Sequence, residues 1–374
     1  MNVRWRDRLI KALLLYFTFI GGSFITEHRL WPGDAHHLIV TVLLGGWLAY
    51  MLIQRRPFPR TPLDVPILLY SLVALLTTVL AVDPRVSIEE LWHVVTHILL
   101  LYLIVDLIRS HGPRAVMEPL FFASAVVILV GFVEFAAWYF GLPLLSLFKQ
   151  GWPQIGGLRA PIPPVIYRLN FTLGYSTGLS AYMAMLIPVG LAWTLSTSSR
   201  ETGGGLTLWL IGALAVEGLS FSRGGLLALS LSLPTLAMLA LVGNGTLLRR
   251  VRTWLHDWRV KVLLVAATVV VVAFAIGWLR QNLAGHRAGD RVRLDLWRSA
   301  MVIGRERPIA GVGLYGYGRA LRSVRSPQLA EDRYTTAHNS LLTTFAEMGI
   351  PGVVSLVWLA GTVARAGDWR WRHE

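Results

Sequence analysis

Long apolar stretches recur along nearly the whole chain, and they limit its possible folds more than any other feature. Several approach or exceed about 18 mostly apolar residues, and a helix that crosses a membrane needs roughly 20. Of the 374 residues, 54% are hydrophobic and 15% are charged, whereas about 25% are charged in an ordinary soluble domain. The sequence therefore predicts an all-α integral membrane protein.

Apolar runs bounded by charges, prolines and glycines predict a polytopic bundle of about ten transmembrane helices. We expect one membrane domain over residues 1–374, with a loop at residues 280–340 that holds short amphipathic helices before the last span. No small-residue cleavage site is evident and further spans follow, so the first run is predicted to be a retained helix. The expected helices cover residues 8–26, 35–53, 64–82, 88–108, 116–140, 173–197, 205–221, 224–243, 262–279 and 341–364.

The charges between these runs predict the orientation. With the N-terminus inside, every inside segment carries Lys or Arg, and "RRVRTWLHDWRVK" is dense in them. Positive residues concentrate in cytoplasmic loops, so both termini are expected to be cytoplasmic. Residues 280–340 then lie outside despite their basic character, because long loops largely escape this rule.

The long basic loop is too long to serve only as a connection, which favours a functional element. Within "RVRLDLWRSAMVIG", a helix would place apolar side chains on one face and arginines mainly elsewhere. This pattern is typical of an amphipathic helix on the protein or in the headgroups. The residues assigned to the apolar face are Leu294, Trp297 and Met301, with Leu296 and Ala300.

Two arginines stand at the outer ends of apolar runs. Arg223 lies in "SFSRGGLLALSL", where two spans are so close that a tight turn must join them. Arg168 precedes a helix whose polar N-terminus would itself attract an anion. Either arginine could instead be an interfacial anchor that snorkels to the headgroups. Their shared face with the basic loop favours anion binding.

His338 follows the basic loop in "TTAHNSLLTTFAEMGIPG". Imidazole has a pKa near 6.5 and suits proton removal near neutral pH, although packing or headgroup contact is the structural alternative. Asn339 and Ser340 are suited to capping the following helix. Glu347 is about 180° from His338 on a continuous helix, which does not support a Glu–His dyad.

A second histidine pattern lies in "EELWHVVTH". Glu89, His93 and His97 share one helical face at a spacing that could hold a divalent metal. Polar packing between helices or headgroup contact is the alternative. The chain has no cysteine, which excludes thiolate metal ligands and a cysteine nucleophile.

The formal net charge is +14. In a membrane protein such an excess fits basic loops, anionic lipid or a phosphate-bearing substrate rather than nucleic acid. Guanidinium groups bind phosphate through paired hydrogen bonds. The arginine-bearing segments with His338 therefore predict an outer-face pyrophosphate site with a neutral base.

Four segments resemble motifs of the O-antigen ligase and O-antigen polymerase superfamily of polytopic membrane glycosyltransferases. They are "RLNFTLGYSTGLSAYMAML", "SFSRGGLLAL", "RLDLWRSAMVIGRERPIAGVGLYGYG" and "AHNSLLTTFAEMGIPG". They cover roughly the second half of the chain in the family's order, and the last two are quite specific. The sequence departs from the family where "GYSTGLSA" replaces a stretch that often contains asparagine, and where the chain ends one helix after the last motif.

The resemblance implies transfer of a glycan from undecaprenyl pyrophosphate to a hydroxyl acceptor, with lipid A core as first choice. It implies an inverting, metal-independent reaction without cofactor, at the periplasmic face of the bacterial inner membrane. Arg168, Arg223 and Arg293 would bind the pyrophosphate, and His338 would be the general base. Arg291, Asn339, Glu347 and His93 are secondary candidates.

Three alternatives remain open from the sequence. Polymerases of O-antigen or exopolysaccharide and protein O-oligosaccharyltransferases share these motifs. A transporter of an anionic lipid or solute would use ionisable residues inside spans, such as Asp106, Glu134 and Glu217, although such residues most often pair within the bundle. A metal-dependent membrane enzyme would use the Glu89, His93 and His97 pattern.

Overall fold

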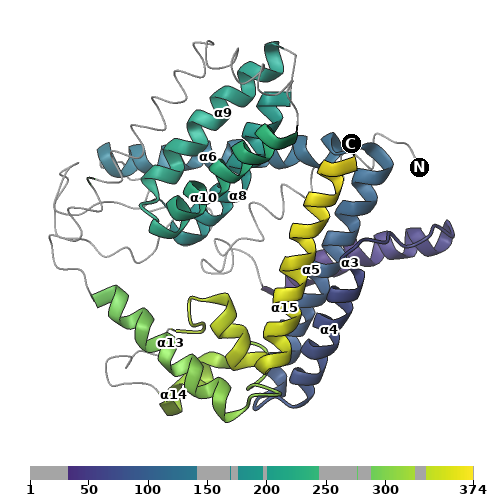
Figure 1. Cartoon of the computed structure of the whole chain (residues 1–374), viewed down its shortest axis with the longest axis vertical. Coiled ribbons are helices and arrows are strands. Elements are labelled where there is room, and N and C mark those ends of the chain that lie inside the picture. Colours follow the sequence, from purple (N-terminus) through teal and green to yellow (C-terminus); the bar gives the residue numbers. More distant parts are fainter. Residues whose placement is uncertain are drawn as a thin grey trace. The chain divides into compact units, whose positions relative to one another are not determined.

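The computed structural model describes residues 33–140, 169, 176–196, 200–243, 276, 288–324 and 334–373, and its regular elements are all helices. This confirms a helical membrane architecture for the described part. Figure 1 shows the helices. They are α3 (Gly33–Ile53), α4 (Asp64–Val79), α5 (Pro84–His111), α6 (Arg114–Phe140), α8 (Ser176–Ser196), α9 (Arg200–Leu219), α10 (Arg223–Gly243), α13 (Ala288–Glu306), α14 (Tyr317–Val324) and α15 (Ser340–His373).

The chain divides into two compact units. The first unit comprises Met1–Ile39 and Ser110–Leu283, and the second comprises Val40–Arg109 and Ala284–Glu374. The prediction of one membrane domain over residues 1–374 stays a prediction.

The first unit is built around α6, α8, α9 and α10. Helix α9 packs against α6 and α8, and α10 packs against α8. Aliphatic and aromatic side chains from these helices form one core, and Trp209 Nε1 donates a hydrogen bond to Ser124 Oγ at 2.9 Å inside it. The buried indole N–H therefore has an acceptor, and this hydrogen bond links α9 to α6.

The second unit joins helices from both ends of the chain. Helix α15 packs against α4 and α13, and α14 packs against α13 and α15. Figure 1 shows α13 and α14 near the N-terminal end of α15. Asp106 is buried, with Arg56 at 3.3 Å and with Trp47 Nε1 donating to its carboxylate at 3.2 Å, so this acidic residue pairs within the bundle as expected.

Within the described part of the chain, four helical segments are long and apolar enough to cross a membrane. They are Pro84–His111, Arg114–Phe140, Ser176–Leu195 and Ser340–Ala366, and shorter apolar helices cover Leu38–Ile53, Asp64–Val79 and Gly203–Leu219. The predicted run at 8–26, and all of the run at 262–279 except Ile276, lie outside the described residues. The number of ten spans therefore stays a prediction.

Helix α13 buries part of the predicted apolar face. Leu296, Ala300 and Ile303 are buried, whereas Leu294, which was predicted to face inward, is 49% exposed. Apolar residues lie on more than one side of this segment, so the packing against α14 and α15 selects the buried face. The sequence correctly predicted an amphipathic helix and placed Leu296 and Ala300 on its apolar face, but it also placed Leu294 there and omitted Ile303.

Helix α15 is interrupted at Gly349, whose φ of 66° and ψ of −163° are not helical. The sequence predicts a bend or interruption at Gly349, Pro351 and Gly352 of "EMGIPG", because glycine and proline disfavour a continuous helix, and the break at Gly349 confirms it. The interruption exposes backbone groups, and the segment Pro308–Gly313 binds them. Ile350 N–H donates to Pro308 O at 2.7 Å, Val312 N–H to Ala346 O at 3.0 Å, and Gly313 N–H to Glu347 O at 3.0 Å.

Gly311→Ala tests this pairing. Gly311 has a φ of 63°, and an added Cβ would overlap the Glu347 carbonyl group. Because backbone atoms cannot move aside as easily as a side-chain end, we expect a loss of about 1–3 kcal/mol and a lower melting temperature of the detergent-purified protein.

Gly45→Ala is the matched control, because Gly45 lies in α3 with open space around its Cβ position. Its melting temperature should stay unchanged or rise slightly, since alanine favours a helix over glycine. Equal melting temperatures for the two variants would contradict the pairing.

Candidate functional site

His338 lies in the short segment that enters α15. Its φ of 50° is in the left-handed region, which is uncommon for a residue other than glycine. Its side chain is exposed and meets the Tyr334 ring edge to face, with 6.4 Å between ring centroids. The backbone therefore holds His338 in an unusual conformation and presents the imidazole at the surface.

Arg293 of α13 acts electrostatically on His338. Partial burial lowers the pKa of the His338 imidazole, and the positive charge of Arg293 lowers it further. Both causes disfavour the protonated ring. His338 is therefore more fully neutral near pH 7 than an ordinary histidine, as a proton acceptor must be.

The residues around His338 fix the entry into α15. Asn339 Oδ1 accepts the N–H of Leu342 at 3.2 Å, and Asn339 O accepts the N–H of Thr343 at 2.8 Å. Thr343 Oγ1 in turn accepts the N–H of Ala337 at 3.2 Å. Asn339 thus caps the helix as predicted, and its side-chain oxygen is engaged in that role.

Glu347 contacts the basic loop. Its side chain is buried, and Oε1 accepts the N–H of Tyr317 at 3.3 Å. The N–H of Tyr315 is also hydrogen-bonded to this carboxylate. These contacts support the interpretation of Glu347 as a structural residue that holds the loop against α15.

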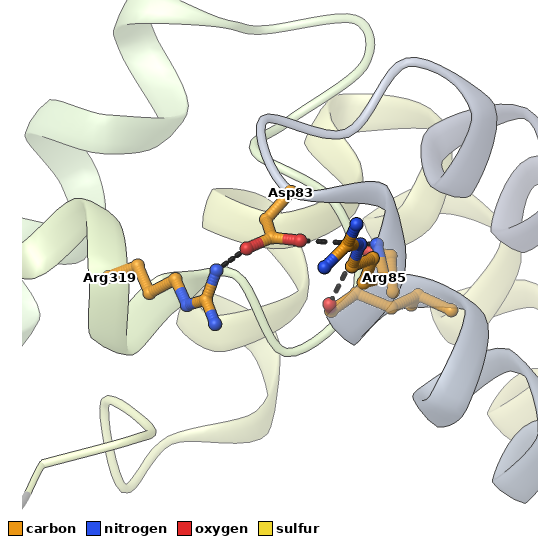
Figure 2. A network of polar contacts seen from close by, with 5 residues as sticks. Asp83, Arg85 and Arg319 are labelled. Atoms are coloured by element: carbon orange, nitrogen blue, oxygen red, sulfur yellow. Dashed lines mark hydrogen bonds and ion pairs between the residues drawn. The ribbon is translucent and has the colours of Figure 1, made fainter.

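The loop is also attached to the turn between α4 and α5. Figure 2 shows Arg319 of α14 paired with Asp83, whose Oδ1 accepts the N–H of Arg85 at 3.1 Å. Val82 N–H donates to Val312 O at 3.1 Å, and Ser87 Oγ donates to Leu314 O at 2.9 Å. The turn and the loop are thereby joined by side-chain and backbone contacts.

Sequence reasoning missed Asp83 and Arg319. The available signal was "VDPRVS", in which an Asp precedes a Pro at the start of a helix. Such an Asp is a typical cap before an N-terminal proline. Nothing in the pattern indicates that the same carboxylate also binds an arginine more than two hundred positions away, because that pairing depends on tertiary packing.

The other predicted site residues are distributed over both units. Arg291 is exposed on α13 of the second unit. Arg223 is the first residue of α10 in the first unit and is also exposed. Arg168 lies outside the described residues. The predicted convergence of Arg168, Arg223 and His338 stays a prediction.

The structure gives no support to the metal hypothesis for Glu89, His93 and His97. Across the described residues, which include all of α5, no group of three His, Asp or Glu side chains could hold a metal ion. His97 Nδ1 donates to the carbonyl of His93 at 2.6 Å, and the His93 ring lies edge to face with Trp92. These rings contact their own helix instead.

The turn that carries Arg223 rests on a buried polar cluster in the first unit. Ser180 Oγ of α8 donates to Glu217 Oε1 of α9 at 2.7 Å, and Gly225 N–H donates to Ser222 Oγ at 3.4 Å. Gly225 lies so close that an added Cβ would overlap both Ser180 Oγ and Glu217 Oε1. Gly225 therefore lets α10 approach α8 and α9.

Gly225→Ala and Gly224→Ala form a matched pair that tests this approach. We expect Gly225→Ala to break the Ser180–Glu217 hydrogen bond or displace α10, at a cost of about 1–3 kcal/mol. The nearest atom to a Cβ on Gly224 is Ser222 Oγ at 4.0 Å, so this variant should be neutral. Melting temperatures measure the difference, and a Gly225→Ala variant as stable as Gly224→Ala would contradict the packing.

The electrostatic link between Arg293 and His338 predicts a measurable titration. NMR of histidine-labelled protein, with His338→Gln to assign the signal, should give a midpoint for His338 below about 6.5, the ordinary value. Arg293→Gln removes the positive charge, which should raise the midpoint. An unchanged midpoint in Arg293→Gln would contradict the link.

Comparison with known proteins gives one finding. Residues 205–357 match the family model described as O-antigen ligase, and this range includes the segments that carry Arg223, Arg293 and His338. No curated protein and no solved structure matches the chain. The predicted resemblance to the O-antigen ligase superfamily is confirmed.

Proposed function

From the O-antigen ligase family match of residues 205–357, we propose that this membrane protein transfers a glycan from undecaprenyl pyrophosphate to a hydroxyl acceptor. The acceptor is the core oligosaccharide of lipid A. The observation that carries the proposal is the electrostatic influence of Arg293 on His338, which together with partial burial lowers the pKa of the imidazole. A neutral base beside a guanidinium suits a reaction that removes a proton and releases a phosphate anion.

The proposed reaction is a single displacement at the anomeric carbon. The acceptor oxygen forms a bond to this carbon while His338 takes the hydroxyl proton. The bond from the anomeric carbon to the pyrophosphate oxygen breaks, and its electron pair leaves with undecaprenyl pyrophosphate. Attack opposite the leaving group inverts the anomeric configuration. No step requires a metal ion or cofactor.

The proposed role of the arginines is to neutralise the departing pyrophosphate. Arg293 lies in the same unit as His338, and the sequence motifs add Arg168 and Arg223. Positive groups placed where negative charge develops in the transition state lower the activation barrier. Groups that bind the substrate and the transition state equally do not lower it in this way. Arg291 is a secondary candidate for the same role, because it is exposed on α13 two positions before Arg293.

The proposed location of the reaction is the periplasmic face of the bacterial inner membrane. This orientation rests on the basic inside segments, which place both termini in the cytoplasm. The basic loop then lies on the same side as a lipid-linked donor that has been moved across the membrane. Membrane lipids surround the remaining apolar surface.

Reconstitution with purified lipid-linked donor tests the activity directly. Purified protein in phospholipid vesicles is given the donor with core oligosaccharide, with a second donor molecule, or with a peptide acceptor. A core-linked product supports the ligase, a longer lipid-linked glycan would indicate a polymerase, and a glycopeptide would indicate a protein transferase. Absence of transfer to all three acceptors would contradict the proposal.

His338→Ala tests the general base. We expect transfer to fall by about 10²–10⁴-fold, the usual contribution of a positioned base, while the variant still binds the donor. His97→Ala is the matched control, because His97 lies on α5 and donates to its own helix backbone. Turnover in His338→Ala equal to that of His97→Ala would show that His338 is not the base.

A further inference from the structure

We propose that Tyr317 is a positioning residue that fixes Arg293 relative to His338, through hydrogen bonds from its backbone and its hydroxyl to two different helices. Its effect on transfer rests on the proposed function, but its effect on the distance between α13 and the His338 segment does not. The contacts of Tyr317 carry the argument in three steps.

Tyr317 connects α15 with α13. Its side chain is fully buried. Its N–H donates to Glu347 Oε1 of α15 at 3.3 Å, and its hydroxyl donates to the carbonyl of Leu296 in α13 at 2.8 Å. Leu296 is three residues after Arg293, within one helical turn. The hydroxyl of Tyr317 therefore fixes the part of α13 that carries Arg293.

The start of α14 also contacts the His338 segment. A Cβ added to Gly318 would lie 3.0 Å from the carbonyl oxygen of Tyr334 and 3.1 Å from Thr335 Cα, so these backbones are in close contact. The Tyr334 ring meets the His338 ring. Tyr317, Leu296 and Ala337 also belong to one buried cluster, so one core joins the segments that carry Arg293 and His338.

The hydroxyl of Tyr317 remains a donor over the accessible pH range. Burial raises the pKa of Tyr317, and the nearby Glu347 carboxylate raises it further. The phenol therefore keeps its proton at any pH at which His338 titrates. A pH titration that covers the His338 range therefore does not remove the proton that Tyr317 donates to the Leu296 carbonyl.

The charged groups around His338 make it a sensitive reporter of this geometry. Arg293 of α13 is the charge that shifts its titration, and Tyr334 is the ring neighbour from its own segment. Arg319 of α14 is paired with Asp83, and the first turn of α15 has no acidic residue. A displacement of α13 should therefore change the His338 midpoint through Arg293.

Tyr317→Phe removes only the hydroxyl, and keeps the ring volume and the N–H bond to Glu347. We expect the His338 midpoint to rise toward that of Arg293→Gln, and kcat to fall by about 10- to 100-fold, the scale of a small misplacement. In the Arg293→Gln background, Tyr317→Phe should cause no further rise, because the charge that it displaces is absent.

Tyr102→Phe is the matched control in the same unit. The Tyr102 hydroxyl donates to Asp64 Oδ1 at 2.8 Å, the same distance as the Tyr317 bond to Leu296. Loss of that bond should leave the His338 midpoint and kcat unchanged. A role of Tyr317 in stability alone would lower the melting temperature of Tyr317→Phe without moving the His338 midpoint, which would overturn the proposal.

Spin labels measure the position without any activity assay. The chain has no cysteine, so spin labels attach only to cysteines that are introduced. Arg298→Cys labels α13 and Thr335→Cys labels the His338 segment, both at exposed positions. The distance distribution between them should broaden or shift in Tyr317→Phe and stay unchanged in Tyr102→Phe. An unchanged distribution and midpoint in Tyr317→Phe would overturn the proposal, whatever the activity.

These measurements also separate the two proposals. If Tyr317→Phe moves the His338 midpoint and the label distance but the wild-type protein transfers no glycan, the positioning role stands and the proposed function fails. If the wild-type protein transfers glycan and Tyr317→Phe changes neither reading, the positioning role fails and the proposed function stands.

Discussion

The interruption of α15 at Gly349 is the constraint on which the second unit depends. A helix that breaks inside a predicted membrane span leaves backbone groups that need partners, because unsatisfied groups are costly where water is excluded. The segment Pro308–Gly313 provides these partners through the hydrogen bonds at Ile350, Val312 and Gly313. The loop is therefore fixed by the helix that follows it, and a continuous helix would offer no such attachment.

The attachment gives the basic loop a defined shape. Glu347 binds backbone N–H groups at the start of α14, and Asp83 binds Arg319 from the same helix. Acidic residues at the two sides of the loop thus hold it without neutralising Arg293. The positive charge of Arg293 lowers the pKa of His338 and so favours the neutral form of its imidazole. The role proposed for His338 depends on this arrangement, in which Glu347 and Asp83 hold the loop and Arg293 acts on the imidazole.

Several features of the fold were predictable because they depend on local sequence. Apolar runs predicted eight of the described helices, and the His-Asn-Ser motif predicted a capped helix start, which Asn339 provides. The exposure of Leu294 in α13 and the contacts of Asp83 were not predictable. Each depends on which other surface packs there, and hydrophobic periodicity carries no information about the partner.

The sequence by itself determined the membrane class, the order of the helices, the interruption of the last span and the identity of His338 as the candidate base. These follow from composition, glycine and proline placement, and the intrinsic pKa of histidine. Only the tertiary structure decided that Glu347 holds the loop, that the His93 and His97 rings contact their own helix, and that Tyr317 connects α13 with α15. Hydrogen bonds between remote segments depend on distance in space, which residue spacing along one helix does not specify.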